Sequence, residues 1–335
     1  MGVANQAGQM IMILVMRYPA FRTPARLVAV AVAAALLTVL AACGGDDGGA
    51  ATGRPTVVVT TSPLGALVRD LVGDTADVEV LIPNDLDPHD FQPSVKDAER
   101  LARADLIVSN GAELETGLEG AIAQARRDGV PTFVMAAHVP LRSGPESGHD
   151  GEEGHDGKEG HEHGASDPHI WLDPVLMARG MAALAPVIEA KLSVDLRDRP
   201  AQQRARLAEL NARLQKAAAQ IPAARRKLVT GHDSLGYFAR RYGFEVVGAV
   251  IPSLSSQAEP SAAQVGGVVA TIRREKVPAI FSETGTPRAV AEAISSDSGA
   301  KVVDLTTHSV ADDGSYYTTM ENLMTTIADN LRDGG

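Results

Sequence analysis

Short apolar segments alternate with helical segments along most of the chain, and this alternation constrains the possible fold more than any other feature. We expect strands at 56–60, 78–82, 106–109, 132–135, 227–230, 246–250, 279–282 and 302–305. Helical segments separate most of these strands, so neighbouring strands must run parallel, with right-handed crossover connections. The sequence therefore predicts an α/β fold with a parallel sheet in each half of the chain.

A long helix is predicted between the two halves. From about Arg199 to Ile221 the apolar residues form one stripe at helical spacing, with Arg and Gln elsewhere. At ~1.5 Å per residue this helix would be about 34 Å long, which suits a rigid connection. We therefore expect two (β/α)4-like lobes, 55–197 and 223–335, joined by one long rigid linker helix, 198–222. Ligands of such folds bind at the carboxyl ends of the strands, here in the cleft between the lobes.

The N-terminal region has the pattern of an export signal. Arginines precede the apolar segment 27–42, which has the length of a signal-peptide core and is short for a membrane span. The segment ends in Leu-Ala-Ala-Cys, which is similar to a bacterial lipobox, so we expect Cys43 to be lipidated. Residues 1–42 are then a lipoprotein signal peptide, and 43–54 form a flexible tether. A short membrane anchor with an incidental cysteine is the alternative.

Charge and cysteine content restrict the partners and the metal ligands. The formal net charge is −11, and we find no basic cluster in the sequence, which argues against nucleic acid as a partner. Cys43 is the only cysteine, so the mature chain is expected to have neither a disulfide nor a thiolate metal site. Any bound metal must therefore be held by histidines and carboxylates.

Four histidines fall at predicted strand ends, two in each half of the chain. They are His89, His169, His232 and His308. Imidazole suits Zn²⁺, with Cu, Ni and Fe as further possibilities, and four such ligands make a closed tetrahedral site. A carboxylate often holds the other nitrogen of a ligating imidazole. Asp90, Asp233 and Glu283 are candidates for this role, although each could equally be a helix cap or a surface acid.

A second group of histidines lies in a polar loop, 147–164. The group consists of His149, His155, His161 and His163, which lie among Gly, Asp and Glu. A tract without core-forming residues is typical of a disordered, metal-contacting segment. We interpret it as accessory, a low-affinity segment that collects, senses or hands over zinc. A solvated linker is the alternative.

Several of these motifs together resemble a known family. The resemblance rests on the lipobox at Cys43, on the His/acid loop and on four motifs, PHDFQPS at 88–94, DPHIWLDP at 167–174, GHD at 231–233 and QAEPS at 257–261. The chain is similar to the cluster A-I solute-binding lipoproteins of bacterial metal ABC importers, the zinc/manganese group. The resemblance covers nearly all of 55–333 and implies two lobes bridged by a rigid helix. It places ligands at His89, His169 and His232, and histidine at the third position favours zinc.

The resemblance breaks down at the fourth ligand. Many members of the family carry Asp there, in a pattern similar to Thr-Asp-Ser, whereas this chain has Thr307, His308 and Ser309. We predict that His308 is the fourth ligand. Water or a nearby carboxylate in that position is the alternative.

The resemblance implies a non-enzymatic, extracytoplasmic binding protein, anchored to the cell membrane through Cys43 and expected to be monomeric. It would capture Zn²⁺ and deliver it to the permease and ATPase of an ABC importer. We expect affinity to fall steeply below about pH 6, because ligating histidines must be neutral.

Three other functions stay open at this point. The chain could bind manganese or another transition metal within the same family, or it could be a surface lipoprotein that only stores metal. It could also be a zinc-dependent hydrolase, which needs an open coordination position and a general base. The His161-Glu162-His163 sequence has the wrong spacing for the zinc-protease motif His-Glu-x-x-His.

Overall fold

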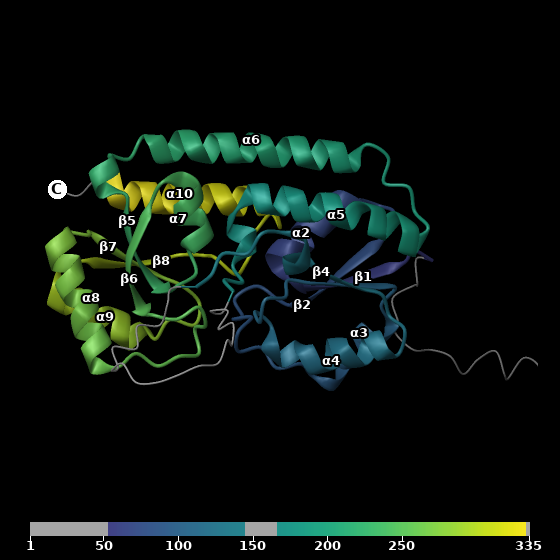
Figure 1. The fold of residues 1–335 in the computed structure, drawn as a ribbon, viewed down its shortest axis with the longest axis horizontal. Coiled ribbons are helices and arrows are strands. Elements are labelled where there is room, and N and C mark those ends of the chain that lie inside the picture. Colours follow the sequence, from purple (N-terminus) through teal and green to yellow (C-terminus); the bar gives the residue numbers. More distant parts are fainter. Residues whose placement is uncertain (1–52, 145–165, 333–335) are drawn as a thin grey trace, which may run out of the picture. The chain divides into compact units, whose positions relative to one another are not determined.

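The computed structural model describes residues 53–144 and 166–332, and its N-terminal lobe is built on a four-stranded parallel sheet (Figure 1). The strands are β1 Thr56–Thr61, β2 Asp77–Ile82, β3 Leu106–Ser109 and β4 Thr132–Val134, in the order β2-β1-β3-β4. Val57 and Val59 of β1 belong to one apolar cluster and Val58 to another. Helices therefore cover both faces of the sheet. They are α2 Ser62–Val72 and α5 Pro174–Leu192 on the first face, and α3 Val95–Arg103 and α4 Thr116–Arg127 on the second.

The C-terminal lobe repeats this arrangement. Its strands are β5 Lys227–His232, β6 Glu245–Ile251, β7 Ala279–Ser282 and β8 Lys301–Asp304, paired in parallel in the order β6-β5-β7-β8. One face is covered by α8 Ala262–Glu275 and α9 Arg288–Ser298, and the other by α7 Gly236–Tyr242 and α10 Tyr316–Arg332. Each sheet thus has the same strand order, and the predicted fold class of two parallel α/β lobes is confirmed.

The helix that connects the lobes, α6 Arg199–Ala219, packs against helices of both (Figure 1). Its neighbours are α2 and α5 on one side and α7 and α10 on the other. The predicted apolar stripe is the buried one, and it includes Leu207, Leu210 and Leu214. One continuous apolar core runs from Val57 in β1 to Phe281 in β7 through these helices. The connection is therefore a packed layer of helices shared by the two sheets.

Most helix and strand boundaries agree with the sequence patterns, with one difference that bears on the site. The helix α3 begins with the capping box formed by Ser94 and Asp97. Strand β5 continues to His232, two residues past its predicted end at 230, because the pairing with β6 extends to the His232–Ile251 pair. As a result, His232 is the last residue of a strand rather than a loop residue.

Several sequence predictions concern residues that the structure does not describe. The signal peptide, Cys43, most of the tether and the four loop histidines lie outside the residues that the structure describes. Within 53–144 and 166–332, no helix is both long enough and apolar enough to cross a membrane.

Candidate metal centre

The four strand-end histidines of the two lobes meet where the lobes face each other. His89 follows β2, His169 immediately precedes a short 3-10 turn before α5, His232 ends β5 and His308 follows β8. All four are buried, with at most 8% of the residue exposed. One ring nitrogen from each lies within 4.8 Å of the others. The structure therefore brings together the four residues that the sequence predicts as metal ligands.

Two of the separations between the ring nitrogens are close to those of a tetrahedral zinc site. The Nε2 atom of His169 lies 3.3 Å from Nε2 of His89 and 3.1 Å from Nε2 of His232. A tetrahedral site with Zn–N bonds of ~2.0–2.1 Å places its nitrogens about 3.3–3.4 Å apart. The His308 ring is stacked on that of His232, and its buried Nε2 has no hydrogen-bond partner among the described residues. Four imidazoles are thus arranged as a metal ion would require.

Carboxylates on the far side of two rings fix where the ring protons lie. Nδ1 of His169 is 2.8 Å from the carboxylate of Asp167, so Nδ1 carries the proton and Nε2 presents its lone pair. Nδ1 of His232 lies 3.1 Å from the carboxylate of Glu283, close but not aligned as a hydrogen bond, and the same assignment follows. Two neutral rings would then direct lone pairs at each other. A cation between them, a proton or a metal ion, removes this repulsion.

In the absence of metal, the electrostatics place that proton on His232. Burial and the neighbouring imidazoles hold the pKa of His89 at about 2 and that of His308 at about 4. The same causes keep the pKa of His169 well below its usual range. Burial is the largest effect on His232 and opposes its charge, but the carboxylates of Glu283, Asp87 and Asp233 together outweigh burial and raise the pKa of His232. Metal binding therefore has one principal proton to displace.

The two histidines of the N-terminal lobe share a local motif, Asp-Pro-His, at 87–89 and 167–169. In both motifs the Asp carboxylate accepts the backbone amide of the histidine, at 3.0 Å, which fixes the backbone at the ligand. Asp167 also forms a 2.6 Å ion pair with Arg142. No role was predicted for Asp87, Asp167 or Arg142, although the repeated Asp-Pro-His motif could have identified the two acids.

The acids predicted to support the ligands occupy three different environments. Glu283 contacts both the ring and the amide of His232, as the role requires. Asp233 is half-buried, and burial raises its pKa to about 6 although the charge of His232 opposes the shift. Asp90 is exposed, and its amide donates to the carbonyl of Asp87. Among the described residues, no imidazole contacts the carboxylate of Asp90.

Trp171 holds the loop that carries the fourth histidine. Its indole Nε1 donates to the carbonyl of Thr307 at 2.7 Å, and its ring lies 5.5 Å from the His308 ring between centroids. The Trp171 carbonyl in turn accepts the hydroxyl of Tyr316 at the start of α10. A residue of the N-terminal lobe therefore fixes the backbone next to His308.

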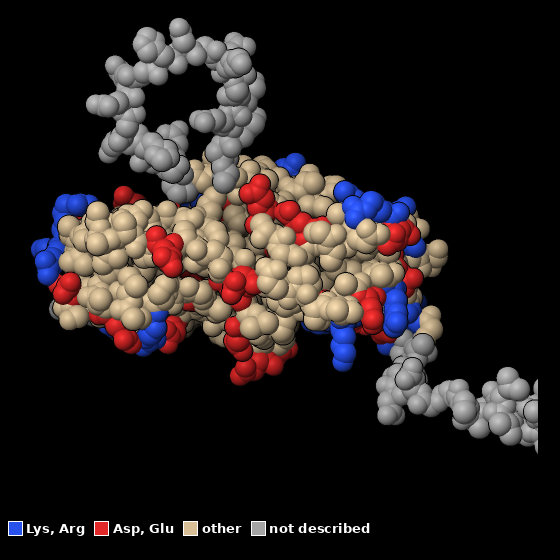
Figure 2. All heavy atoms as spheres, turned by 90° about the horizontal axis from the view of Figure 1, so that it is seen from below, with Lys and Arg blue, Asp and Glu red and all other residues tan. Residues whose placement is uncertain are grey.

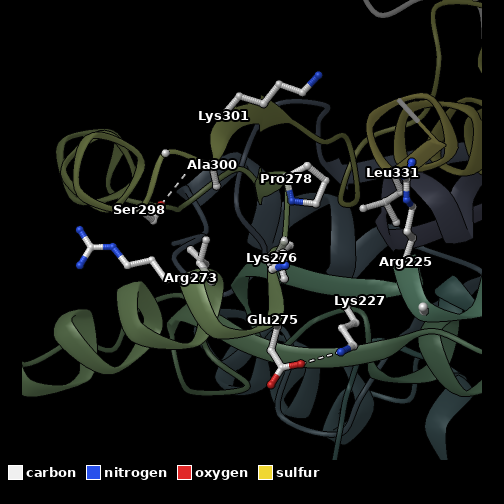
Figure 3. Close-up of a pocket in the computed structure, with 14 residues that line it drawn as sticks. Arg225, Lys227, Arg273, Glu275, Lys276, Pro278, Ser298, Ala300, Lys301 and Leu331 are labelled. Carbon is white, nitrogen blue, oxygen red and sulfur yellow. Dashed lines mark hydrogen bonds and ion pairs between the residues drawn. The ribbon is translucent and has the colours of Figure 1, made fainter. Parts of the chain in front are cut away.

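A cavity lies away from the four histidines, at the end of the C-terminal sheet where β5, β7 and β8 begin (Figure 3). It has a volume of about 860 Å³, and no histidine lines it. Two of its cationic side chains have local partners: Lys227 pairs with Glu275, and Arg273 donates to the carbonyl of Asp297 near the end of α9. Cations near helix carboxyl termini stabilise those helices. None of the predicted metal ligands lines this cavity.

Comparison with known proteins gives consistent matches over most of the chain. Residues 57–330 match the family described as zinc-uptake complex component A, periplasmic. The high-affinity zinc uptake system protein ZnuA of Bacillus subtilis is 35% identical over 256 residues, which cover 75% of this chain and 77% of that protein. The manganese ABC transporter substrate-binding lipoprotein PsaA of Streptococcus pneumoniae is 27% identical over 283 residues, covering 82% and 88%.

The fold also matches solved structures. The periplasmic zinc binding protein TroA from Treponema pallidum aligns with a TM-score of 0.69 at 27% identity, over 83% of this chain and 99% of that protein. Of these three proteins, two are named for zinc and one for manganese. Their names alone leave the choice of metal to the chemistry of the site.

Proposed function

The chain belongs to the family of zinc-uptake complex component A, and from this premise we propose that it captures Zn²⁺ outside the cytoplasmic membrane and delivers it to an ABC-type metal importer. In this proposal His89, His169, His232 and His308 are the metal ligands. The observation that carries it is the convergence of four buried imidazoles, each with one ring nitrogen within 4.8 Å of the others.

The donor set favours zinc over manganese. Four imidazole nitrogens suit Zn²⁺, whereas Mn²⁺ prefers carboxylate and other oxygen ligands. The nearest carboxylates have other partners: that of Asp167 binds the back of a ligand ring, and that of Asp87 accepts a hydroxyl and an amide. Manganese, copper, nickel or iron binding by the same four histidines is the alternative within this function.

A site with four protein ligands favours metal binding over catalysis, because no coordination position stays open. A catalytic zinc keeps one coordination position for water or substrate, whereas four protein ligands fill all of them. The rings are also buried, which leaves a substrate little access to the metal. A zinc hydrolase would require one of the four histidines to remain unbound, and we therefore place the chain among binding proteins.

Surface charge supports the capture of a cation. The formal net charge is −11, and Figure 2 shows Asp and Glu mainly in the middle of one face, with Lys and Arg gathered toward its two sides. A negative surface raises the local concentration of cations and speeds their association.

The remaining parts of the proposal rest on the sequence. A lipid on Cys43 would hold the protein at the cell membrane, where the permease and ATPase of the importer are its partners. Contacts with the histidines of the loop 147–164 would be accessory to the main site, and the protein would act as a monomer.

The proposal is tested by metal titration of residues 44–335. We expect one tightly bound Zn²⁺ per chain, and we expect His169→Ala to abolish tight binding. His138→Ala is the matched control, because His138 is exposed and stacks on Phe133 away from the site. A wild-type chain without tightly bound zinc, or tight binding that survives His169→Ala, would contradict the proposal.

A further inference from the structure

His89 is the metal-site histidine with the least support from regular structure. It lies at the end of the segment 83–89, here called the His89 segment, which follows β2 and consists of turns. His232, by contrast, is the last residue of a strand. The position of His89 relative to the other three rings must therefore depend on the contacts that the His89 segment makes.

At its beginning, the His89 segment is bonded to the loop that carries His308. The amide side chain of Asn84 forms a pair of hydrogen bonds with Val310, donating to its carbonyl at 3.0 Å and accepting from its amide at 3.1 Å. The amide of Asp85 donates to the hydroxyl of Ser309 at 2.8 Å. Two ligand loops from different lobes are thus joined directly, one and two residues after His308.

Nearer to His89, the contact to the other lobe is made by Asp87. One carboxylate oxygen accepts the amide of His89, and the other accepts the hydroxyl of Ser256 in the loop after β6. Gly285 lets the two lobes approach here: it has a φ of +89°, and a Cβ at this position would lie 2.1 Å from the Asp87 carboxylate. The contact is therefore built into the backbone of the C-terminal lobe.

The second Asp-Pro-His motif uses its carboxylate differently. One carboxylate oxygen of Asp167 accepts from Arg142, which belongs to the same lobe. The other oxygen contacts the backbone amide and the ring Nδ1 of His169. Asp87 makes no contact with the ring of His89 among the described residues, and its second oxygen crosses to the other lobe. Of the two motifs, the one that carries His89 is thus the one whose carboxylate depends on the C-terminal lobe.

Resting on the proposed metal-binding function, we propose that Asn84, Asp87 and Ser256 are positioning residues that hold His89 on the metal and set the rate at which the metal leaves. Asn84 and Asp85 are exposed, and they line a groove of about 320 Å³ together with Ser309 and Val310. Water in this groove can replace the bonds between the lobes once they break. The His89 segment then moves away and removes one ligand, while the other three histidines keep their buried supports.

The test measures the rate at which bound Zn²⁺ is lost to excess chelator after rapid mixing. We expect Ser256→Ala and Asn84→Ala each to raise the dissociation rate about tenfold, and to change the association rate by less than about twofold. Ser255→Ala is the matched control, because the Ser255 hydroxyl accepts only the amide of Gln257 in the same loop. Ser256→Thr keeps a hydroxyl and should return the rate toward that of the wild type.

A general loss of stability must be separated from loss of positioning. We expect Ser256→Ala to unfold, without metal, at the same temperature as Ser255→Ala, while only Ser256→Ala releases zinc faster. Dissociation rates within twofold of wild type in both Ser256→Ala and Asn84→Ala would overturn the inference, and so would a faster rate that Ser256→Thr does not reverse. A wild-type chain that binds no zinc would instead overturn the proposed function.

Discussion

The Nδ1 atom of His169 lies 2.8 Å from the carboxylate of Asp167, and both side chains are completely buried. This contact orients the imidazole so that its Nε2 faces the rings of His89 and His232. It also fixes the ring proton on the side away from them, which is the tautomer that a metal ligand needs.

Replacing Asp167 with Asn should therefore weaken zinc binding without removing a ligand. We expect Asp167→Asn to lower affinity by about 10- to 100-fold, as found for partners that orient metal-bound histidines. Competition with a chelator of known affinity measures the change. Asp90→Asn is the control, since Asp90 is exposed, and it should bind within about twofold of wild type. Equal affinities for the two variants would show that Asp167 does not orient the ligand.

The pH dependence of affinity should correspond to one proton. Burial opposes a charge on His232, but Glu283, Asp87 and Asp233 raise its pKa, so His232 takes up a proton at a higher pH than the other ligands. The pKa values of about 2 for His89 and about 4 for His308 keep those rings neutral above pH 5. Zinc must displace the proton on His232, so affinity falls as pH falls below the pKa of that residue. We expect about a tenfold loss per pH unit.

Titrations between pH 5 and 8, corrected for protonation of the chelator, measure this slope. Because the pKa of His232 is raised above its ordinary value of 6.5, the loss should begin above the pH of about 6 expected from the sequence, and it should be gentler than four ordinary histidines would give. A hundredfold or greater loss per pH unit would mean that at least two ligands are protonated together. A flat profile would mean that His232 is neutral before zinc binds.

The fourth ligand can be tested by removing the His308 ring. We expect His308→Ala to lower zinc affinity by about 100-fold or more, because the variant leaves a coordination position open. His138→Ala again serves as the control. Affinity that stays at the wild-type level in His308→Ala would place water or a carboxylate at the fourth position and would leave the stacked His308 ring without a role in binding.

The continuous apolar core predicts that the two lobes unfold together. Leu210 in α6 is completely buried between helices of the two lobes, so Leu210→Ala should lower the free energy of unfolding by about 2–5 kcal/mol. Gln215→Ala, on the exposed side of the same helix, should change it by about 0.5 kcal/mol or less. Denaturant titration should show one transition in both variants. Two separated transitions would mean that the lobes are independent.

Much of the fold could be predicted because its strands are buried on both faces. The strands at 106–109 and 279–282 have the predicted bounds, since short apolar runs are local signals. The end of β5 could not be predicted from local sequence signals. It reaches His232 because Ile251, nineteen residues later, pairs with it. The lobe boundaries at 55–197 and 223–335 stay a prediction from the sequence, because one apolar core extends across both sheets.

The site residues could be predicted only where the order and direction of the strands alone bring them close together. Parallel strands bring their carboxyl ends to one edge, so four histidines at such ends were expected to meet. The supporting residues depend on tertiary partners: Ser256 is 169 residues from Asp87 in sequence, and nothing local indicates their contact. Asp90 is adjacent to His89 in sequence, but the turn formed with Asp87 leaves it exposed.

The central feature of the proposed site is that four imidazoles hold one Zn²⁺. X-ray absorption at the zinc edge of the loaded wild-type chain tests this directly, because it counts and identifies the atoms around the metal. We predict four nitrogen neighbours at ~2.0–2.1 Å, all from imidazole rings. An oxygen neighbour, or three or fewer imidazoles, would contradict it.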